Sequence, residues 1–212
     1  RPQEALVMVG ITGTNGKTTT AFMLASIFRA LGEKTAVLGT IYNDMDGEKR
    51  KSYNTTPESL DLQKLLKEMA DKKYDAVVME VSSHALALKR AEACSFDVSV
   101  YTNLTLDHLD FHKTFKNYLA AKTLLFSRHT AGGKAVVNLD DKYGAKIARA
   151  ARAVKVPVLT YGIDKKADIR AVDIESGLAG LSFSVKYGRK SFSVKLSLPG
   201  RHNVYNALAA AG

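Results

Sequence analysis

Residues 13–20, GTNGKTTT, have the composition of a phosphate-binding loop. The apolar run LVMVGIT precedes them and the amphipathic run AFMLASIFRAL follows, so the glycine-rich turn joins a strand to a helix. In that context the backbone N–H groups and the positive end of the helix dipole face an anion. Lys17 can then reach the β- and γ-phosphates of a nucleotide, and Thr18 can ligate magnesium.

This loop therefore predicts binding of ATP together with Mg²⁺. The common pattern has a glycine where this chain has Ile11, so the loop is a variant, and a structural turn without nucleotide is the alternative. The residues expected at the nucleotide are Gly13, Thr14, Asn15, Gly16, Lys17, Thr18 and Thr19.

Polar side chains end two other apolar runs. Glu80 closes DAVVME, and Asn103 follows VSVYT and leads into a segment that contains His108. Ligands of open α/β sheets bind beyond the carboxyl ends of the strands, and oxygen-rich clusters with one imidazole suit magnesium. Taken singly, Glu80 could instead cap a helix, and His108 could be a hydrogen-bonded surface residue.

Lys122 lies inside an apolar helical stripe. The members of that stripe are Phe115, Tyr118, Leu119, Leu125 and Phe126. Lysine is rarely buried without a partner, because burial disfavours its charged form. Two interpretations follow: either the ammonium reaches water along an extended stem, or a neutral amine has reacted with carbon dioxide to give an anionic carbamate.

The segment TTPES also has two interpretations. Thr56 could cap a helix with Pro57 at its first position, which would explain both residues without any function. A helix N-terminus that carries Thr55 and Thr56 is equally suited to bind an anion.

The order of elements predicts one α/β domain over residues 1–212, a mostly parallel sheet flanked by helices. Strands are expected at residues 6–12, 35–38, 76–80, 98–101, 135–138 and 156–161, and helices at residues 18–31, 58–69, 115–126 and 141–151. A hairpin or an excursion, not a helix, is expected around Asp46 and Gly47, and an antiparallel hairpin is expected around Gly188 and Arg189. The second hairpin would extend the sheet or form a small lobe.

Composition narrows the class of protein. The chain has 212 residues, 46% of them hydrophobic, and no apolar run long enough to cross a bilayer, so we expect a cytoplasmic protein without a membrane partner. Its net charge of +10 is scattered along the chain, as on a solvated surface, and an anionic small molecule would fit the same excess. Charge alone does not decide between these partners, and we expect no nucleic-acid partner. Cys94 is the single cysteine, which excludes an internal disulfide and indicates a structural thiol.

Several of these segments together resemble the central domain of the Mur ligases. They are GTNGKTTT, NTTPESLDLQ, MEVSSHAL with Arg90, TNLTLDHLDFH, YLAAKTLLF and LPGRHNVYNALAAAG, in the family's order. Within the family, NTTP followed by EVSSHAL is most similar to the members that add the third residue of the peptidoglycan stem peptide. Folylpolyglutamate synthase is related and shares the phosphate loop.

The resemblance implies that ATP phosphorylates the D-glutamate carboxylate of a UDP-N-acetylmuramoyl dipeptide, and that the amine of lysine or diaminopimelate then attacks the acyl phosphate. It implies a catalytic set of Lys17, Glu80, His108 and Lys122. Thr18 and Glu80 would hold one magnesium ion. Glu80, His108 and a carbamylated Lys122 (N6-carboxylysine) would hold a second.

The resemblance also assigns binding residues. Those expected at the UDP-sugar peptide are Thr55, Thr56, Ser82 and Arg90. Asn103 would lie beside the γ-phosphate or the metal, and Asn203 and Asn206 near the nucleotide base. The family adds an N-terminal domain for the uridine group and a C-terminal domain for the amino acid. Because this chain shows neither, we expect it to bind ATP with little or no ligation.

Two other functions stay open at this point, beside nucleic-acid binding, which rests only on the net charge. One is an ATP-dependent ligase of the same superfamily that acts on another stem residue or on an unrelated carboxylate. The other is a nucleotide-binding module without chemistry, against which Glu80, His108 and Lys122 argue, because a pure binding module has no need of a second metal site.

Overall fold

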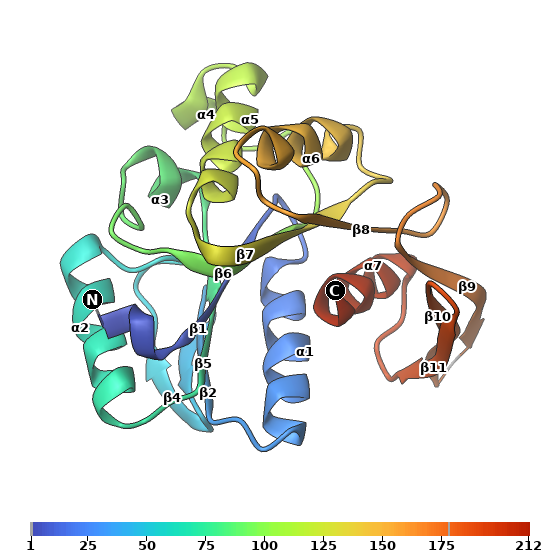
Figure 1. Ribbon diagram of the computed structural model, residues 1–212, viewed down its shortest axis with the longest axis horizontal. Coiled ribbons are helices and arrows are strands. Elements are labelled where there is room, and N and C mark those ends of the chain that lie inside the picture. Colours follow the sequence, from blue (N-terminus) through green and yellow to red (C-terminus); the bar gives the residue numbers. More distant parts are fainter. Residues whose placement is uncertain (1, 178) are drawn as a thin grey trace.

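A single sheet organises the chain, with the strand order β11-β10-β9-β8-β7-β6-β1-β5-β2-β3-β4 (Figure 1). The computed structural model describes residues 2–177 and 179–212. The strands are β1 (Val7–Thr12), β2 (Thr35–Leu38), β3 (Tyr42–Met45), β4 (Glu48–Lys51), β5 (Ala76–Glu80), β6 (Phe96–Tyr101), β7 (His129–Asn138), β8 (Val158–Gly162), β9 (Ile169–Gly177), β10 (Gly180–Tyr187) and β11 (Lys190–Leu196). The helices are α1 (Lys17–Ala30), α2 (Ser59–Asp71), α3 (Ser83–Ala87), α4 (Leu109–His112), α5 (Phe115–Thr123), α6 (Gly144–Ala153) and α7 (Arg201–Ala211), with the 3-10 turns η1 (Pro2–Ala5) and η2 (Leu124–Ser127).

The central strands are parallel. Strand β1 pairs with β5 and β6, β5 pairs with β2, and β6 through β9 continue the parallel order. Every residue of β5 is buried, as expected for a strand with both faces covered by helices. The predicted mostly parallel α/β sheet is therefore confirmed.

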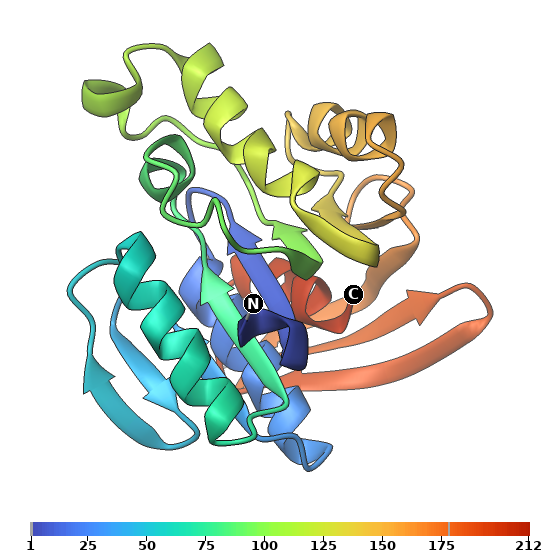
Figure 2. The same ribbon diagram turned by 60° about the vertical axis from the view of Figure 1, so that its left-hand side comes forward.

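Neighbouring residues of β1 pack into different cores because strand side chains alternate between faces. Met8 packs in a cluster with Leu62 of α2 and Tyr118 of α5. Val9 packs in a second cluster with Ala21 of α1 and with residues of α7. Helices α2, α5 and α6 thus cover one face of the sheet, and α1 and α7 cover the other (Figure 2).

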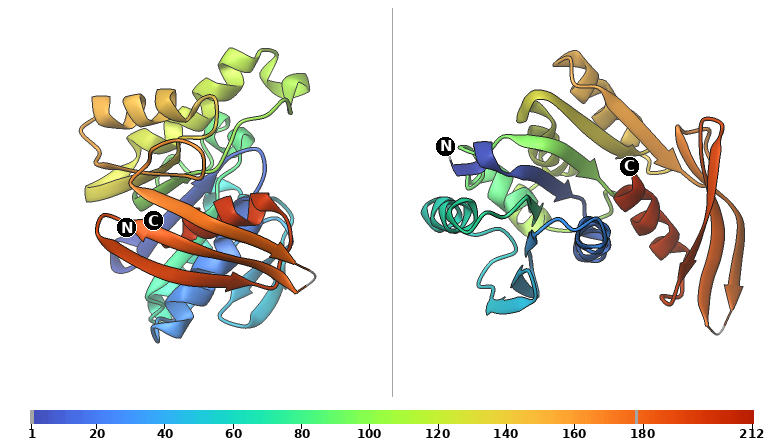
Figure 3. Two further views of the ribbon diagram at one scale, coloured as in Figure 1. Left: turned by 90° about the vertical axis from the view of Figure 1, so that its right-hand side faces the viewer. Right: turned by 60° about the horizontal axis from the view of Figure 1, so that its bottom comes forward.

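Both edges of the sheet are antiparallel, as predicted. Strands β3 and β4 turn through Asp46 and Gly47, whose φ angles of 58° and 99° suit a tight hairpin. Strands β10 and β11 turn at Gly188, with φ 58°, and β9 pairs antiparallel with β10. These strands continue the sheet past β8 and flank α7 (Figure 3), so the hairpin extends the sheet and forms no separate lobe.

The structure corrects some boundaries. The helix predicted over residues 115–126 ends at Thr123 and continues as the 3-10 turn η2. The short helices α3 and α4 were not predicted, because segments of this length carry too little periodicity. Within the described residues, no helix is both long enough and apolar enough to span a bilayer.

Parallel pairing brings the carboxyl ends of several strands to one edge. The loop after β1 therefore lies beside Glu80 at the end of β5, Thr102 after β6 and Asn138 at the end of β7. The polar residues predicted from strand ends lie along this edge.

Candidate active site

The loop between β1 and α1 is tightly packed against the end of β6. A Cβ on Gly13 would overlap the Thr102 hydroxyl, so only glycine fits there. Asn103 supports the loop in three places: its backbone oxygen accepts from Thr14 N (2.9 Å), its Oδ1 accepts from Asn15 N (2.9 Å), and its Nδ2 donates to Asn15 O (3.1 Å). Asn103 therefore fixes the shape of the loop, a contact that the sequence did not predict.

Two lysines converge on one oxygen of this loop. Lys17 Nζ and Lys122 Nζ both donate to Gly13 O, at 2.9 and 2.8 Å. Only 1% of Lys122 is exposed, so the interpretation that its ammonium reaches water is wrong. Burial, reinforced by the charge of Lys17, lowers the pKa of Lys122 to about 6, and burial also lowers the pKa of Lys17. Near neutral pH, Lys122 is therefore largely an uncharged amine.

Tyr118 joins the loop to the imidazoles of the next segment. Its fully buried hydroxyl hydrogen-bonds Thr14 Oγ1 at 3.0 Å, and Lys122 Nζ lies 4.6 Å from the centre of its ring. His112 stacks on the same ring at 5.0 Å, and His108 meets it edge-on at 5.9 Å. The sequence placed Tyr118 only in the apolar stripe; a buried phenol needs a polar partner, and that requirement is the signal that could have found it.

Glu80 is the buried carboxylate of the site. Glu80 is fully buried, and its Oε1 accepts hydrogen bonds from Thr18 Oγ1 (2.9 Å) and from Thr40 N (3.0 Å). Oε2 accepts from Thr40 Oγ1 at 3.0 Å. A carboxylate and a hydroxyl in contact are oxygen donors of the kind that magnesium prefers, so Thr18 and Glu80 fit that ion. The structure thus brings together the two residues predicted to hold the first magnesium.

The structure brings the residues predicted to hold the second magnesium together less fully. His108 has a left-handed backbone (φ 53°) and a side chain 44% exposed, with its ring 4.8 Å from that of His84. His112 is buried and bonds Ser83 Oγ at 2.9 Å. Burial, and then neighbouring imidazoles, lower the pKa values of His84 and His112. Over residues 2–177 and 179–212, no three His, Cys, Asp or Glu side chains gather to hold a metal ion, so this group stays a prediction.

The residues predicted to contact the UDP-sugar peptide lie together beyond β5. Thr56 is fully buried, donates to Glu80 O (2.8 Å) and accepts from Ser82 N (3.0 Å). The capping interpretation is therefore wrong: α2 begins at Ser59, and Thr56 instead joins the loop to β5. Arg90 pairs with Glu58 at 2.7 Å, and its buried Nε has no hydrogen-bond partner among the residues that the structure describes.

The other two residues predicted to contact this peptide, Ser82 and Thr55, bond different parts of the structure. Ser82 Oγ accepts from Ala85 N at 3.1 Å and so caps α3. Thr55 Oγ1 lies 3.1 Å from Thr40 Oγ1, which connects it to the Glu80 carboxylate. Thr40 was not predicted; it follows Gly39 just beyond the end of β2, and the same rule about strand ends would have found it.

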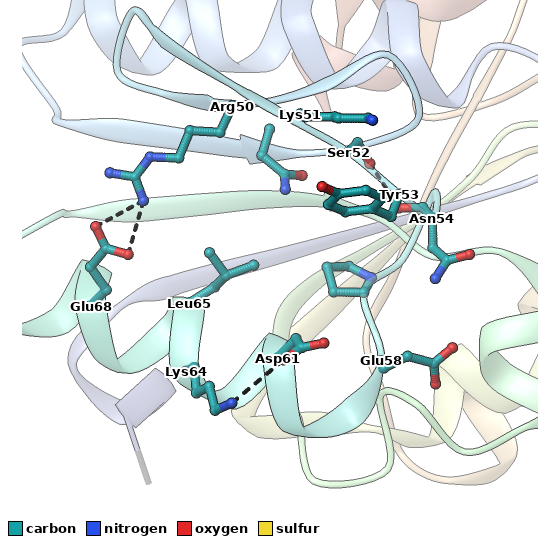
Figure 4. Close-up of a pocket in the computed structure, with 12 residues that line it drawn as sticks. Arg50, Lys51, Ser52, Tyr53, Asn54, Glu58, Asp61, Lys64, Leu65 and Glu68 are labelled. Atoms are coloured by element: carbon teal, nitrogen blue, oxygen red, sulfur yellow. Dashed lines mark hydrogen bonds and ion pairs between the residues drawn. The ribbon is translucent and has the colours of Figure 1, made fainter.

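A groove runs beside this loop, between the β3–β4 hairpin and α2 (Figure 4). Its volume is about 470 Å³, and Asn54 and Pro57 lie on its wall. Arg50 and Glu68 pair at 2.9 Å across it. Its charged side chains thus partly satisfy one another.

A second cavity of about 590 Å³ opens next to the loop, on the side of α7. Asn206 lies on its wall against Gly16, where a Cβ would overlap the amide oxygen. Asn203 lies behind it, buried, and accepts from Asn206 Nδ2 at 3.0 Å. Further lining residues, which the sequence did not predict, are Thr102, Thr105, Asn138, Asp140, Asp141, His202 and Tyr205. Asn138, Asp140 and Asp141 end or follow β7, so strand-end reasoning could have included them.

Cys94 is buried and accepts a hydrogen bond from Gln63 Nε2 at 3.6 Å. Burial raises the pKa of its thiol to about 11, so the thiolate is scarce at neutral pH. The expected structural role fits this position.

Comparison with known proteins agrees with this geometry. Residues 11–212 match the family model described as the Mur ligase middle domain. The chain belongs to the Mur ligase family. This is the family that the sequence segments resembled. The matched domain contains the glycine-rich loop, the buried Glu80 and the buried Lys122.

Two curated relatives of this Mur ligase domain are named UDP-N-acetylmuramoyl-L-alanyl-D-glutamate–2,6-diaminopimelate ligase. The protein of Clostridium botulinum is 44% identical over the whole chain, and that of Bacillus velezensis is 46% identical. A solved structure with the same name superposes with a TM-score of 0.90 at 34% identity over 98% of the chain. The chain spans only 42–44% of the length of these proteins.

Replacing Lys122 by methionine should remove a pH dependence of stability. The unfolded lysine keeps its proton up to the ordinary value of 10.5, whereas the folded one loses it near 6, so the unfolded state binds more protons between these limits. Stability of the wild type should therefore rise with pH in this window, by up to about 1.4 kcal/mol per pH unit.

Urea unfolding in carbon dioxide-free buffer at about pH 6.5 and about pH 9 measures this slope. Lys122→Met should flatten it, while Lys67→Met, at an exposed position on α2, should leave it unchanged. An equal slope in the wild type and Lys122→Met would contradict the assignment.

Proposed function

We propose that the chain is the ATP-binding domain of a longer ligase that extends a UDP-N-acetylmuramoyl dipeptide during peptidoglycan synthesis in the cytoplasm. One observation carries this proposal: the hydrogen bond between Thr18 of the phosphate loop and the buried Glu80 carboxylate. It joins the nucleotide side of the site to the acceptor side, since Glu80 also contacts Thr40, which reaches Thr55. Family membership supports the same reaction class.

The reaction would proceed in two steps. A carboxylate oxygen of the dipeptide attacks the γ-phosphorus of ATP, the bond to the β-phosphate oxygen breaks, and ADP leaves. The amine of the incoming amino acid then attacks the acyl carbon, phosphate leaves with the carbon–oxygen bond pair, and the amine loses a proton as the amide forms. Lys17 would swing from Gly13 O and Thr14 O to the phosphoryl group.

Thr18 and Glu80 would hold magnesium, which when bound neutralises charge on the phosphoryl oxygens. Asn103 would keep the loop in shape around the phosphates, because it bonds both Thr14 and Asn15. The cavity bounded by Gly16 and Asn206 would take the nucleoside, with Asn203 holding the Asn206 amide in place.

Lys122 would act as a carbamate. Its neutral amine attacks the carbon of CO₂ and releases one proton, which turns an uncharged side chain beside Lys17 into an anion. The carbamate nitrogen keeps one N–H, so its hydrogen bond to Gly13 O can persist. The anion would also attract the charge of Lys17, which shares the same acceptor. With Glu80 and His108, the carbamate would complete the second magnesium site.

On the acceptor side, Thr55 and Arg90 are the residues we assign to direct contact with the UDP-sugar peptide. Arg90 retains an unpaired buried Nε, a donor suited to a carboxylate. Thr56 is fully buried and Ser82 caps α3, so these two would act by shaping the loop. The names of the relatives favour 2,6-diaminopimelate over lysine as the amino acid.

Nucleotide binding tests the proposal first. Calorimetric titration of the chain with a non-hydrolysable ATP analogue and Mg²⁺ should show binding that Lys17→Ala abolishes, because Lys17 provides the charge at the phosphates. Lys67→Ala, which removes an exposed lysine of α2, should bind like the wild type. Equal loss in both variants, or preferential salt-sensitive binding of DNA, would argue against a nucleotide-specific site.

The carbamate has its own signature. Protein equilibrated with ¹³C-bicarbonate should show a carbamate carbon resonance that is absent from Lys122→Met and present in Lys67→Met. Lys122 is the expected position because its amine is neutral near pH 7. A resonance that survives in Lys122→Met would assign the modification elsewhere.

Ligation should need the flanking domains of the longer protein. We expect the 212-residue chain to bind nucleotide without forming the amide, and a full-length protein to release ADP and phosphate only with both substrates present. A panel of UDP-muramoyl peptides and a folate substrate, followed by mass spectrometry of the product, separates the proposed ligase from other members of the superfamily. Amide formation by the chain alone would contradict this division.

A further inference from the structure

The end of β2 approaches the Glu80 carboxylate more closely than the sequence suggests. A Cβ on Gly39 would overlap Glu80 Oε1, so a glycine is required for this approach. The next residue, Thr40, then reaches both oxygens of the carboxylate: its backbone N donates to Oε1 (3.0 Å) and its Oγ1 donates to Oε2 (3.0 Å). The two bonds fix the plane of the carboxylate.

The direction of the protons in this group follows from chemistry. An ionised carboxylate only accepts hydrogen bonds, so the single proton of the Thr40 hydroxyl points to Glu80. Thr40 Oγ1 is also placed to donate to Thr55 Oγ1, at 3.1 Å. Because the hydroxyl has one proton, Thr55 competes with Glu80 for it, and the charged carboxylate is the stronger acceptor.

We propose that Thr40 is a positioning residue that orients Glu80 toward magnesium and couples that orientation to the acceptor loop at Thr55. The inference rests on the proposed function, in which Glu80 holds the metal and Thr55 contacts the dipeptide. Thr40 is exposed at the edge of the sheet. Its hydroxyl bonds the Glu80 carboxylate, so it would act through Glu80 and not on the reacting atoms.

The metal side of the proposal follows from how ligand carboxylates behave. Hydrogen bonds to a ligating carboxylate orient it, and losing one typically lowers metal affinity about 10- to 100-fold. Without the Thr40 hydroxyl, Oε1 would keep its bonds from Thr18 and from the backbone of Thr40, while Oε2 would lose its bond from this side chain. The carboxylate could then rotate about the bonds that remain.

The acceptor side follows from the same proton count. Thr55 Oγ1 and Glu80 Oε2 are both placed to accept the one proton of the Thr40 hydroxyl. A ligand that hydrogen-bonds Thr55 would change how well Thr55 competes for this proton, and so would change the support of Glu80. Because such coupling is reciprocal, metal at Glu80 and a ligand at Thr55 influence each other's binding.

Binding of Mn²⁺ as a magnesium substitute, followed by electron paramagnetic resonance with a non-hydrolysable ATP analogue present, tests the proposal without relying on catalysis. Thr40→Val keeps the backbone N–H and the shape but loses the hydroxyl, so we expect affinity about 10- to 100-fold weaker. Thr40→Ser restores the hydroxyl and should bind close to wild type. Thr130→Val, which removes a hydroxyl bonded to Asp97 away from the site, is the matched control and should bind normally.

A double-mutant cycle tests the link to Thr55. Thr55→Val should change Mn²⁺ affinity by less than Thr40→Val does, and it should have no effect in the Thr40→Val background. Wild-type affinity in Thr40→Val, equally weak binding in Thr40→Ser, or full additivity in the cycle would each overturn the inference. Thermal melting in EDTA checks that every variant is folded before it is titrated.

Glu80→Gln distinguishes a failure of the proposed metal site at Glu80 from a failure of the positioning role of Thr40. If Glu80→Gln binds Mn²⁺ like the wild type, the assignment of Glu80 to the metal fails, and the proposed function loses its metal site. If Glu80→Gln is weak while Thr40→Val is normal, the proposed function stands and Thr40 has no positioning role. Weak binding in both, restored in Thr40→Ser, supports both.

Discussion

The Glu80 carboxylate is buried between the phosphate loop and the end of β2, and the rest of the site depends on how it is held. Thr18 and Thr40 bond its oxygens, and Thr56 bonds its backbone oxygen. These contacts connect α1, β2 and the loop before α2 to the same residue of β5. A buried carboxylate is costly unless its oxygens are satisfied. The surrounding elements are thus constrained to meet there, and they form a group of oxygen atoms that suits the magnesium ion we propose.

The two lysines impose a second constraint. Lys17 and Lys122 share the Gly13 carbonyl oxygen, and the fold accommodates them by lowering the pKa of both through burial. Tyr118 lies against Lys122 and bonds Thr14, so α5 and the phosphate loop keep a fixed relation. Burying two lysine side chains against one carbonyl oxygen is costly for the folded protein. If the loop binds a nucleotide as we propose, the same side chains lie beside its phosphates, so stability and the proposed function make opposite demands on Lys122.

The sheet explains why these groups meet. Parallel pairing of β2, β5, β1, β6 and β7 brings their carboxyl ends to one edge, and α7 borders the cavity at that edge to which we assign the nucleoside. Strands β9 to β11 extend the sheet and pack on α7, which holds Asn206 against Gly16. The antiparallel part of the fold thus contributes to the site indirectly, through the position of one helix.

The sequence by itself determined the local features: the phosphate loop, the parallel core, the turns at Gly47 and Gly188, and the anomaly of Lys122. Each depends on a few neighbouring residues or on a repeating pattern, so each can be read along the chain. Tertiary structure decided which side chains meet. Lys122 reaches Gly13 across 109 positions, and Thr40 reaches Glu80 across 40. Local propensity carries no information about partners so far apart, and for the same reason Thr56 reads as a cap in sequence yet in the fold joins its loop to β5.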